Sequence, residues 1–165
     1  MPDRALPQSA RGSYIQLSMA EIIPIGADHA GVGLKARLIQ ELQALGFQPD
    51  DVGTHSTDSV DYPDFAHEVA SRVESGRAER GILLCGTGLG MAYAANRHAG
   101  VRAAVAWSPE IAALARGHND ANVLVLPARF VTEEQGVSIL RTWLETPFEG
   151  GRHSQRIQKI EQESA

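Results

Sequence analysis

The stretch Gly81–Met91 constrains the fold more than any other part of the chain. It reads Gly-Ile-Leu-Leu-Cys-Gly-Thr-Gly-Leu-Gly-Met, a short apolar run that breaks into alternating glycines. A helix-compatible segment, Ala92–Asn96, follows directly. A buried strand, a glycine-rich loop and a helix start are therefore expected in succession. Such a junction directs backbone N–H groups and the positive end of a helix dipole at one point, which suits an anion.

The only cysteine of the chain, Cys85, is placed where this strand ends and the loop begins. A thiol there is close to fixed positive potential, which favours the thiolate and would let it act as a base or nucleophile. The competing interpretation is a small buried hydrophobic residue, the commoner role of an isolated cysteine. Our working hypothesis is that Cys85 acts on a small anionic substrate held by the loop.

Strand-like and helix-like segments alternate along the rest of the chain. Strands are expected at residues 21–27, 47–53, 82–85, 101–106 and 123–126. Helices are expected between and after them, at residues 34–45, 65–76, 92–96, 108–117, 132–146 and 152–163. Their apolar residues recur at intervals of three and four, the period of an amphipathic helix. The alternation predicts an α/β three-layer sandwich with a five-stranded parallel sheet, whose active site lies beyond the strand carboxyl ends.

Length and composition indicate one ordinary globular domain. The chain has 165 residues, of which 43% are hydrophobic and 21% are charged, as is usual for such domains. Residues 1–20 lack apolar periodicity and a secretory hydrophobic region, so we expect a disordered N-terminal extension before a domain at 21–165. Met19 is an alternative start.

Charge and cysteine content exclude several classes of function. One cysteine gives neither an internal disulfide framework nor a CxxC-type zinc site, which fits a reducing, cytoplasmic location. A net charge of −5 argues against broad nucleic-acid binding. No apolar run approaches the roughly 20 residues that span a bilayer. An acidic protein that binds an anion must gather its positive charge locally.

In two dipeptides, a histidine stands next to a carboxylate or an amide side chain. Histidine titrates near neutral pH. Asp28-His29 follows the first strand, where Asp28 could hold substrate hydroxyls and His29 could contact a phosphate. The alternative for Asp28 is an Asx turn that caps the next helix. His118-Asn119 lies between a helix end and a strand, where an electrostatic cap and an acid–base role are equally compatible with the sequence.

Three arginines are candidates for binding a phosphate. Arg152 and Arg156 are four residues apart, so their guanidinium groups share one face of a helix. No carboxylate lies four residues from either one, although a simply solvated face remains the alternative. Arg129 follows the fifth strand and could instead pair with Glu133 or Glu134.

Two segments have part of a nucleotide-binding motif but lack residues that the motif requires. Gly26–Gly31 has the glycine spacing of a Walker A loop, but Val32 and Gly33 stand where Lys and Ser/Thr are required. In the loop after Cys85, Met91 replaces the third glycine of the dinucleotide fingerprint, and no acidic residue ends the next strand. Nucleotides are therefore not the expected ligands.

Together these residues resemble the type B ribose-5-phosphate isomerases, in the sugar-phosphate isomerase family that includes the galactose-6-phosphate isomerase subunits. The resemblance covers roughly residues 21–163. Its motifs are Gly26-Ala-Asp-His-Ala-Gly31, Asp61-Tyr-Pro63, Gly81–Gly90, Ala94-Ala-Asn96, Gly100-Val-Arg-Ala103, His118-Asn-Asp-Ala-Asn-Val123 and Gly150-Gly-Arg-His-Ser-Gln-Arg156. It implies a Rossmann-like fold that needs no metal or cofactor. It also implies a homodimer or tetramer with active sites at the subunit interface.

The resemblance also implies a role for each candidate residue. Cys85 would be the base that moves a proton between C1 and C2 of a sugar phosphate through a cis-enediolate, and His118 would protonate the ring oxygen during opening. The developing oxyanion would be stabilised by Thr87 and by the backbone N–H groups of Gly86, Gly88, Leu89 and Gly90. Asp28 and Asn119 would hold hydroxyls, Tyr62 would line the site, and phosphate would bind His29, Arg129, Arg152 and Arg156, some of them from the partner subunit.

Some members of that family use a glutamate of this loop as the base. The equivalent position here is Leu89, so the chain resembles the cysteine type. Pro24 and the N-terminal extension depart from the family pattern without touching a candidate site residue.

The expected reaction is interconversion of ribose 5-phosphate and ribulose 5-phosphate by an aldose–ketose isomerase. The same chemistry on a tetrose or hexose phosphate remains an alternative, because the motifs fix the reaction better than the sugar. A non-catalytic sugar-phosphate sensor or partner subunit is a second alternative. Retention of Cys85, Thr87 and His118 together argues against it, because binding alone needs no base.

Overall fold

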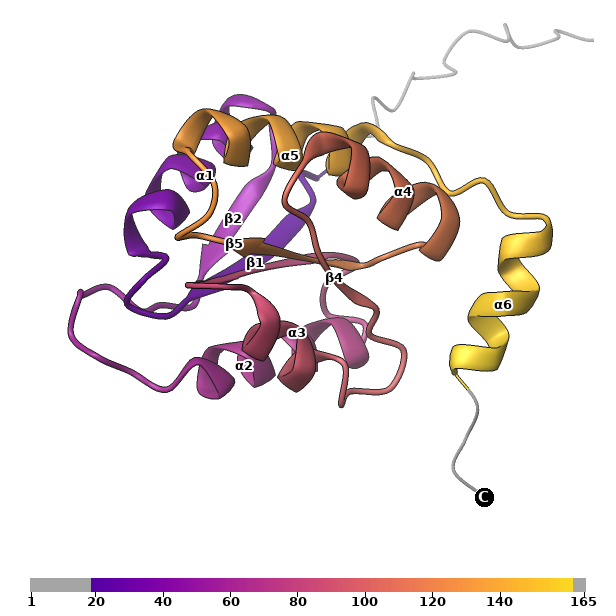
Figure 1. The fold of residues 1–165 in the computed structure, drawn as a ribbon, viewed down its shortest axis with the longest axis horizontal. Coiled ribbons are helices and arrows are strands. Elements are labelled where there is room, and N and C mark those ends of the chain that lie inside the picture. Colours follow the sequence, from indigo (N-terminus) through magenta and orange to yellow (C-terminus); the bar gives the residue numbers. More distant parts are fainter. Residues whose placement is uncertain (1–18, 162–165) are drawn as a thin grey trace, which may run out of the picture.

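The computed structural model describes residues 19–161, so the extension predicted at residues 1–20 falls almost wholly outside the described part (Figure 1). Five parallel strands form one sheet in the order β2-β1-β3-β5-β4. They are β1 (Ile22–Ala27), β2 (Gln48–Asp51), β3 (Gly81–Cys85), β4 (Ala103–Val105) and β5 (Val123–Pro127). The helices are α1 (Val32–Ala44), α2 (Tyr62–Glu74), α3 (Leu89–Ala95), α4 (Pro109–Asn119), α5 (Glu133–Glu145) and α6 (Arg152–Ile160). The predicted α/β class and five-stranded parallel sheet are confirmed.

Helices cover both faces of the sheet, and α6 stands apart from this body (Figure 1). Side chains of a strand alternate between the two faces, and β3 shows it clearly. Ile82 and Leu84 join the core beneath α1, α4 and α5. Leu83 and Cys85 join the core on the side of α2 and α3. The alternation thus directs the Cys85 side chain toward α2 and α3. None of the helices within residues 19–161 is long and apolar enough to cross a membrane.

The strand order also determines where a ligand site is expected. From β1 the chain moves outward to β2 and then crosses to β3 on the other side of β1. The sequence order therefore reverses between β1 and β3, and ligands of open parallel sheets bind beyond the carboxyl ends of the strands at such a reversal. Asp28 and Cys85 lie at these two strand ends.

The structure corrects three predicted helix boundaries. Helix α3 begins at Leu89 rather than at Ala92, so the end of the glycine-rich segment is already helical. Helix α2 begins at Tyr62 rather than near Phe65, with Pro63 in its first turn, a position that tolerates the missing N–H. Helix α4 continues through His118 and Asn119 instead of ending by Gly117. It ends where Asp120 adopts a left-handed conformation (φ 46°), which Asp tolerates better than most residues.

Pro24 lies in β1 without breaking the sheet. Backbone groups alternate in direction along a strand, and the Ala27 N–H bonds Gly53 of the β2 side whereas the Asp28 N–H bonds Leu84 of β3. The Pro24 nitrogen therefore faces β3, and pairing with β3 begins only at the next residue, Ile25. No ladder hydrogen bond of this pairing is lost to the proline.

A partly buried ion pair ties α1 to the end of β2. The Lys35 side chain is 3% exposed, and its ammonium donates hydrogen bonds to Asp51 Oδ1 (2.5 Å) and to the Thr54 carbonyl (2.8 Å). Burial raises the pKa of Asp51, but hydrogen bonds from Lys35 and from the Gly53 N–H outweigh it, so this pKa lies below its ordinary value. The pair should therefore stabilise the fold at neutral pH.

We expect Asp51→Asn to lower the free energy of unfolding at pH 7 by about 2–3 kcal/mol, because it leaves the buried Lys35 ammonium without a counter-charge. The matched control is Asp50→Asn, which removes a more exposed carboxylate paired with Arg72 and should cost at most about 1 kcal/mol. Urea unfolding measures both.

The same measurement at low pH tests the cause. Since the folded pKa of Asp51 lies below the unfolded value of about 3.9, its contribution is complete above pH ~4 and is lost as the pH falls through the folded value. The wild-type and Asp51→Asn curves should thus converge below pH ~4. A constant difference down to pH 2 would contradict this account.

Candidate active site

Cys85 is the last residue of β3 and is only 4% exposed. Its Sγ accepts a hydrogen bond from the Gly88 N–H at 3.2 Å. Gly88 has φ 77°, and a Cβ there would lie 3.1 Å from Val105 Cγ1. Both the turn and the space therefore call for glycine. The Gly88 N–H thus donates to the sulfur, in line with the expectation that backbone N–H groups of the loop point toward Cys85.

The loop after Cys85 carries two further candidate residues. Thr87 is exposed, and its Oγ1 accepts a hydrogen bond from the Leu89 N–H at 3.3 Å. The Arg129 guanidinium lies over Gly86, where a Cβ would be 3.1 Å from Arg129 Nη1. The Arg129 N–H also donates to the Gly86 carbonyl at 3.1 Å. Arg129 forms no ion pair with Glu133 or Glu134, so its cationic group remains available beside the loop.

Asp28 and His29 follow β1 and are oriented by local hydrogen bonds. Asp28 is 7% exposed, and its Oδ1 accepts from the Ala30 N–H at 2.9 Å. The Asx-turn alternative is therefore present, but it uses one carboxylate oxygen and the other can accept from a ligand hydroxyl. The Val60 N–H donates to His29 Nδ1 at 3.3 Å. A neutral His29 then carries its proton on Nε2, where it can donate to an anion.

Tyr62, the first residue of α2, packs against the start of α3. A Cβ on Gly90 would lie 2.5 Å from the Tyr62 ring, so the ring lies directly on the Gly90 backbone. The structure thus gathers one set of candidate residues at the carboxyl ends of β1, β3 and β5. We call this set the carboxyl-edge group: Asp28, His29, Tyr62, Cys85, Gly86, Thr87, Gly88, Leu89, Gly90 and Arg129.

The other candidates lie at the opposite edge of the sheet. His118 and Asn119 are in the last turn of α4, and β5 begins four residues after Asn119, at Val123. The Gly81 N–H, at the start of β3, donates to the Asn122 carbonyl at 2.9 Å. The five residues of β3, roughly 15 Å in length, therefore separate this edge from Cys85.

Helix α6 belongs to the same edge because the preceding loop is fastened to α4. The Glu149 N–H donates to the Gly117 carbonyl at 3.0 Å. Arg152 and Arg156 follow on α6 and are exposed. We call this second set the amino-edge group: His118, Asn119, Arg152 and Arg156. One chain does not bring the amino-edge group to Cys85.

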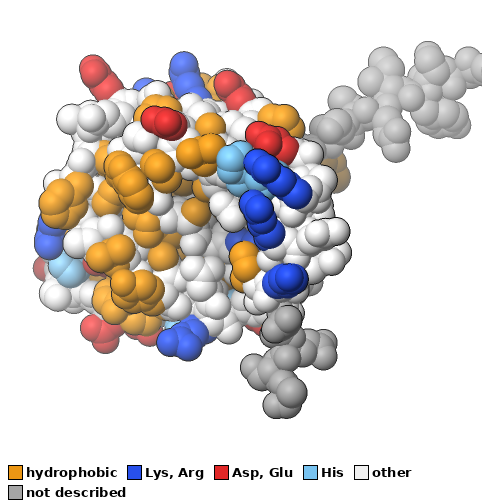
Figure 2. Space-filling view, turned by 45° about the vertical axis from the view of Figure 1, so that its right-hand side comes forward, with side chains coloured by type: hydrophobic (Ala, Val, Ile, Leu, Met, Phe, Trp, Pro, Cys, Tyr) orange, Lys and Arg blue, Asp and Glu red, His pale blue; other side chains and the backbone are white. Residues whose placement is uncertain are grey.

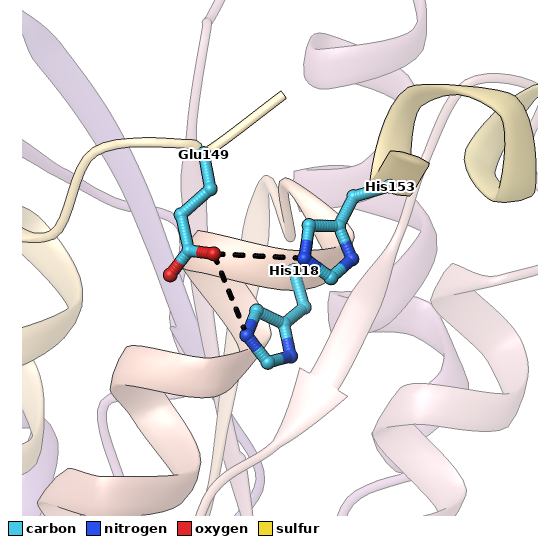
Figure 3. Close-up of side chains that lie close together, drawn as sticks. All are labelled: His118, Glu149 and His153. Atoms are coloured by element: carbon cyan, nitrogen blue, oxygen red, sulfur yellow. Dashed lines mark ion pairs between the residues drawn. The ribbon is translucent and has the colours of Figure 1, made fainter. Parts of the chain in front are cut away.

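His118 has two neighbours that sequence reasoning did not assign to the site. Its ring stacks on that of His153, with centroids 4.3 Å apart and planes 13° apart. Glu149 Oε2 lies 3.7 Å from His118 Nε2 and 3.5 Å from His153 Nε2, and Figure 3 shows both imidazoles turned toward it. Glu149 lies in an irregular loop with no periodic pattern, so no sequence signal marked it.

Comparison with known proteins identifies the family of the chain. A model of the family described as Ribose/Galactose Isomerase matches residues 23–160. Ribose-5-phosphate isomerase B of Escherichia coli is 44% identical over 138 residues, which cover 84% of this chain and 93% of that protein. The chain belongs to the ribose/galactose isomerase family.

Solved structures of the ribose/galactose isomerase family share the fold at high identity. Ribose 5-phosphate isomerase of Thermotoga maritima is 50% identical, with a TM-score of 0.83 over 86% of this chain and 97% of that one. Ribose-5-phosphate isomerase B of Mycoplasma genitalium, with bound ribulose-5-phosphate, is 44% identical with a TM-score of 0.84, covering 87% and 96%. The family resemblance predicted from the motifs is confirmed.

Proposed function

We propose that this protein interconverts ribose 5-phosphate and ribulose 5-phosphate. The observation that carries the proposal is the Gly88 N–H at 3.2 Å from Cys85 Sγ, at the point where the strand order reverses. A nearly buried thiol held by a backbone donor at a strand end is positioned to exchange a proton with a carbon acid bound beside it. The relatives named above carry this activity in their names, which supports the same substrate here.

The proposed reaction moves one proton between adjacent carbons. The Cys85 thiolate takes the proton from C2 of the open-chain aldose, and negative charge develops on the C1 carbonyl oxygen of a cis-enediolate. The Thr87 hydroxyl and those backbone N–H groups of Gly86–Gly90 that do not bond Cys85 Sγ or Thr87 Oγ1 are proposed to stabilise this oxyanion. The thiol returns the proton to C1, while the O2 hydroxyl proton passes to O1. Reactant and product therefore have the same atoms and the same charge.

The phosphate is proposed to bind arginines that carry no carboxylate partner. Within residues 19–161, six arginines form ion pairs, namely Arg37, Arg72, Arg80, Arg102, Arg116 and Arg141. Arg129, Arg152 and Arg156 have none in this part of the chain. A guanidinium free of carboxylates can bind a phosphate bidentately without first breaking an ion pair. His29 adds a donor on Nε2 in the loop after β1.

A complete site requires a second copy of the chain. His118 would protonate the ring oxygen and Asn119 would hold a hydroxyl, yet both lie at the edge opposite Cys85. We propose a homo-oligomer in which the amino-edge group of one subunit meets the carboxyl-edge group of its partner. Isologous association of two copies forms two such sites per dimer.

Exposed hydrophobic side chains support this association. Several follow strand ends or begin helices at the carboxyl edge: Tyr62 (40% exposed), Leu89 (49%), Trp107 (60%) and Phe130 (71%). Figure 2 shows hydrophobic side chains gathered over one face, with histidine and basic side chains beside them. Large exposed apolar areas bordered by polar groups are typical of protein interfaces.

A panel of four-, five- and six-carbon aldose phosphates tests the substrate. We expect the highest kcat/KM for ribose 5-phosphate in a coupled or direct ketose assay. A preference for a tetrose or hexose phosphate would support the proposed type of reaction but contradict ribose 5-phosphate as the substrate. Absence of turnover on every member would contradict the enzymatic function and favour a binding subunit.

Single substitutions test the assigned roles. Cys85→Ala should lower kcat at least about 1,000-fold with substrate binding retained, because the base is removed. Arg152→Ala should mainly raise KM and the calorimetric Kd, by about tenfold or more. Lys159→Ala on the same helix is the matched control and should leave both values within about twofold. A Cys85→Ala enzyme with near-normal kcat would refute the mechanism.

Mixing two inactive variants tests the shared site. If Cys85 and His118 of one site come from different chains, a Cys85→Ala/His118→Asn hetero-dimer holds one intact site and one doubly altered site. Co-refolding equal amounts should then restore about one quarter of wild-type activity, since half of the dimers are mixed. Each variant refolded alone provides the control. Activity no higher than the controls would show that each chain carries its own complete site.

A further inference from the structure

His118, Glu149 and His153 form a cluster that the proposed reaction does not fully use. We propose that this cluster binds a divalent transition-metal ion such as Zn²⁺ or Co²⁺, and that the bound ion inhibits the enzyme. Two imidazoles and one carboxylate are the ligand set of open, three-ligand zinc sites. Nitrogen-rich sets of this kind prefer zinc, cobalt, nickel and copper to magnesium and calcium.

The distances between the ligand atoms fit one ion after small side-chain rotations. Four ligands placed tetrahedrally at about 2.0–2.1 Å from zinc are about 3.3 Å apart. Glu149 Oε2 lies 3.5 Å from His153 Nε2 and 3.7 Å from His118 Nε2. All three ligand atoms lie within 4.8 Å of one another. The two stacked rings must tilt so that both nitrogen lone pairs converge (Figure 3).

The backbone holds the three ligands in place before any ion binds. The Glu149 N–H donates to the Gly117 carbonyl at 3.0 Å, which fastens the loop to the end of α4. A Cβ on Gly117 would lie 3.1 Å from Glu149 Oε1, so the missing side chain gives the carboxylate its room. Gly150 and Gly151 have φ of 66° and 59° and turn the chain sharply between Glu149 and His153.

The three side chains of the cluster differ in exposure, and this difference suits a metal site. The His153 side chain is 8% exposed, while those of His118 and Glu149 are 40% and 60% exposed. One ligand is thus anchored, and the other two leave a side open through which an ion enters and water completes its coordination. Arg152 and Arg156 on α6 add positive charge that opposes a cation. We therefore expect a Kd of ~1–10 μM rather than the nanomolar values of closed structural zinc sites.

Inhibition follows from the position of His118, and this step rests on the proposed function. A metal on His118 Nε2 occupies the lone pair that would otherwise carry the proton for ring opening. The ion and the proton compete for the same nitrogen, so occupancy of the cluster should remove turnover. Metal binding itself does not depend on that assignment.

The test uses the full chain after chelation. Isothermal titration with Zn²⁺ should give about one ion per chain, and Co²⁺ should produce a visible absorption band of four- or five-coordinate geometry. Mg²⁺ should give neither. Glu149→Gln and His153→Gln should each weaken Zn²⁺ binding at least about tenfold, with thermal unfolding used to verify their fold. His55→Gln, which removes an exposed histidine outside the cluster, is the matched control.

Activity is then measured against Zn²⁺ on the same proteins. Loss of turnover that parallels site occupancy, reverses with a chelator and is weakened in His153→Gln supports the proposal. Absence of Zn²⁺ binding, or binding unchanged in both variants, overturns the metal site. Binding without inhibition overturns the coupling to His118. A chelated wild-type protein with no isomerase activity counts against the proposed function alone, because the titration and the cobalt spectrum need no turnover.

Discussion

The direction of the parallel sheet is the constraint on which the rest of this structure depends. Every strand ends at the same edge, so the loops after β1, β3 and β5 meet there. Asp28, Cys85 and Arg129 are brought together by this rule although about a hundred residues separate the first from the last. The same rule places the residues that precede β5, including His118, at the other edge. The fold of one chain therefore separates the candidate residues into the carboxyl-edge group and the amino-edge group, which is why a second copy is proposed to complete the site.

This division explains which features the sequence could predict. The strand, loop and helix around Cys85 are local, and their order follows from the apolar run and the glycines of Gly81–Met91. The placement of Asp28 and Cys85 at the same edge of the sheet follows from the rule that parallel strands end together. Local patterns thus sufficed for the fold class and for the carboxyl-edge group.

Other features depend on contacts between distant segments and could not be predicted. Gly117 suggested a helix end, but Glu149 lies against it and α4 continues to Asn119, where Asp120 supplies the left-handed residue. The cluster of Glu149, His118 and His153 joins two segments that are far apart in the sequence and are held together partly by the Glu149 N–H bond to the Gly117 carbonyl. No periodicity or charge pattern in a single sequence encodes such a meeting.

Several arginines within residues 19–161 of this acidic chain form no ion pair with a carboxylate of that part. Six of the eleven arginines within residues 19–161 form ion pairs with carboxylates, whereas Arg129 and Arg152, at opposite edges of the sheet, form none with the residues described. Unpaired guanidinium groups at an interface repel one another unless an anion lies between them. A sugar phosphate bound between two subunits would supply that anion. Substrate binding and subunit association are then coupled, because each lowers the electrostatic cost of the other.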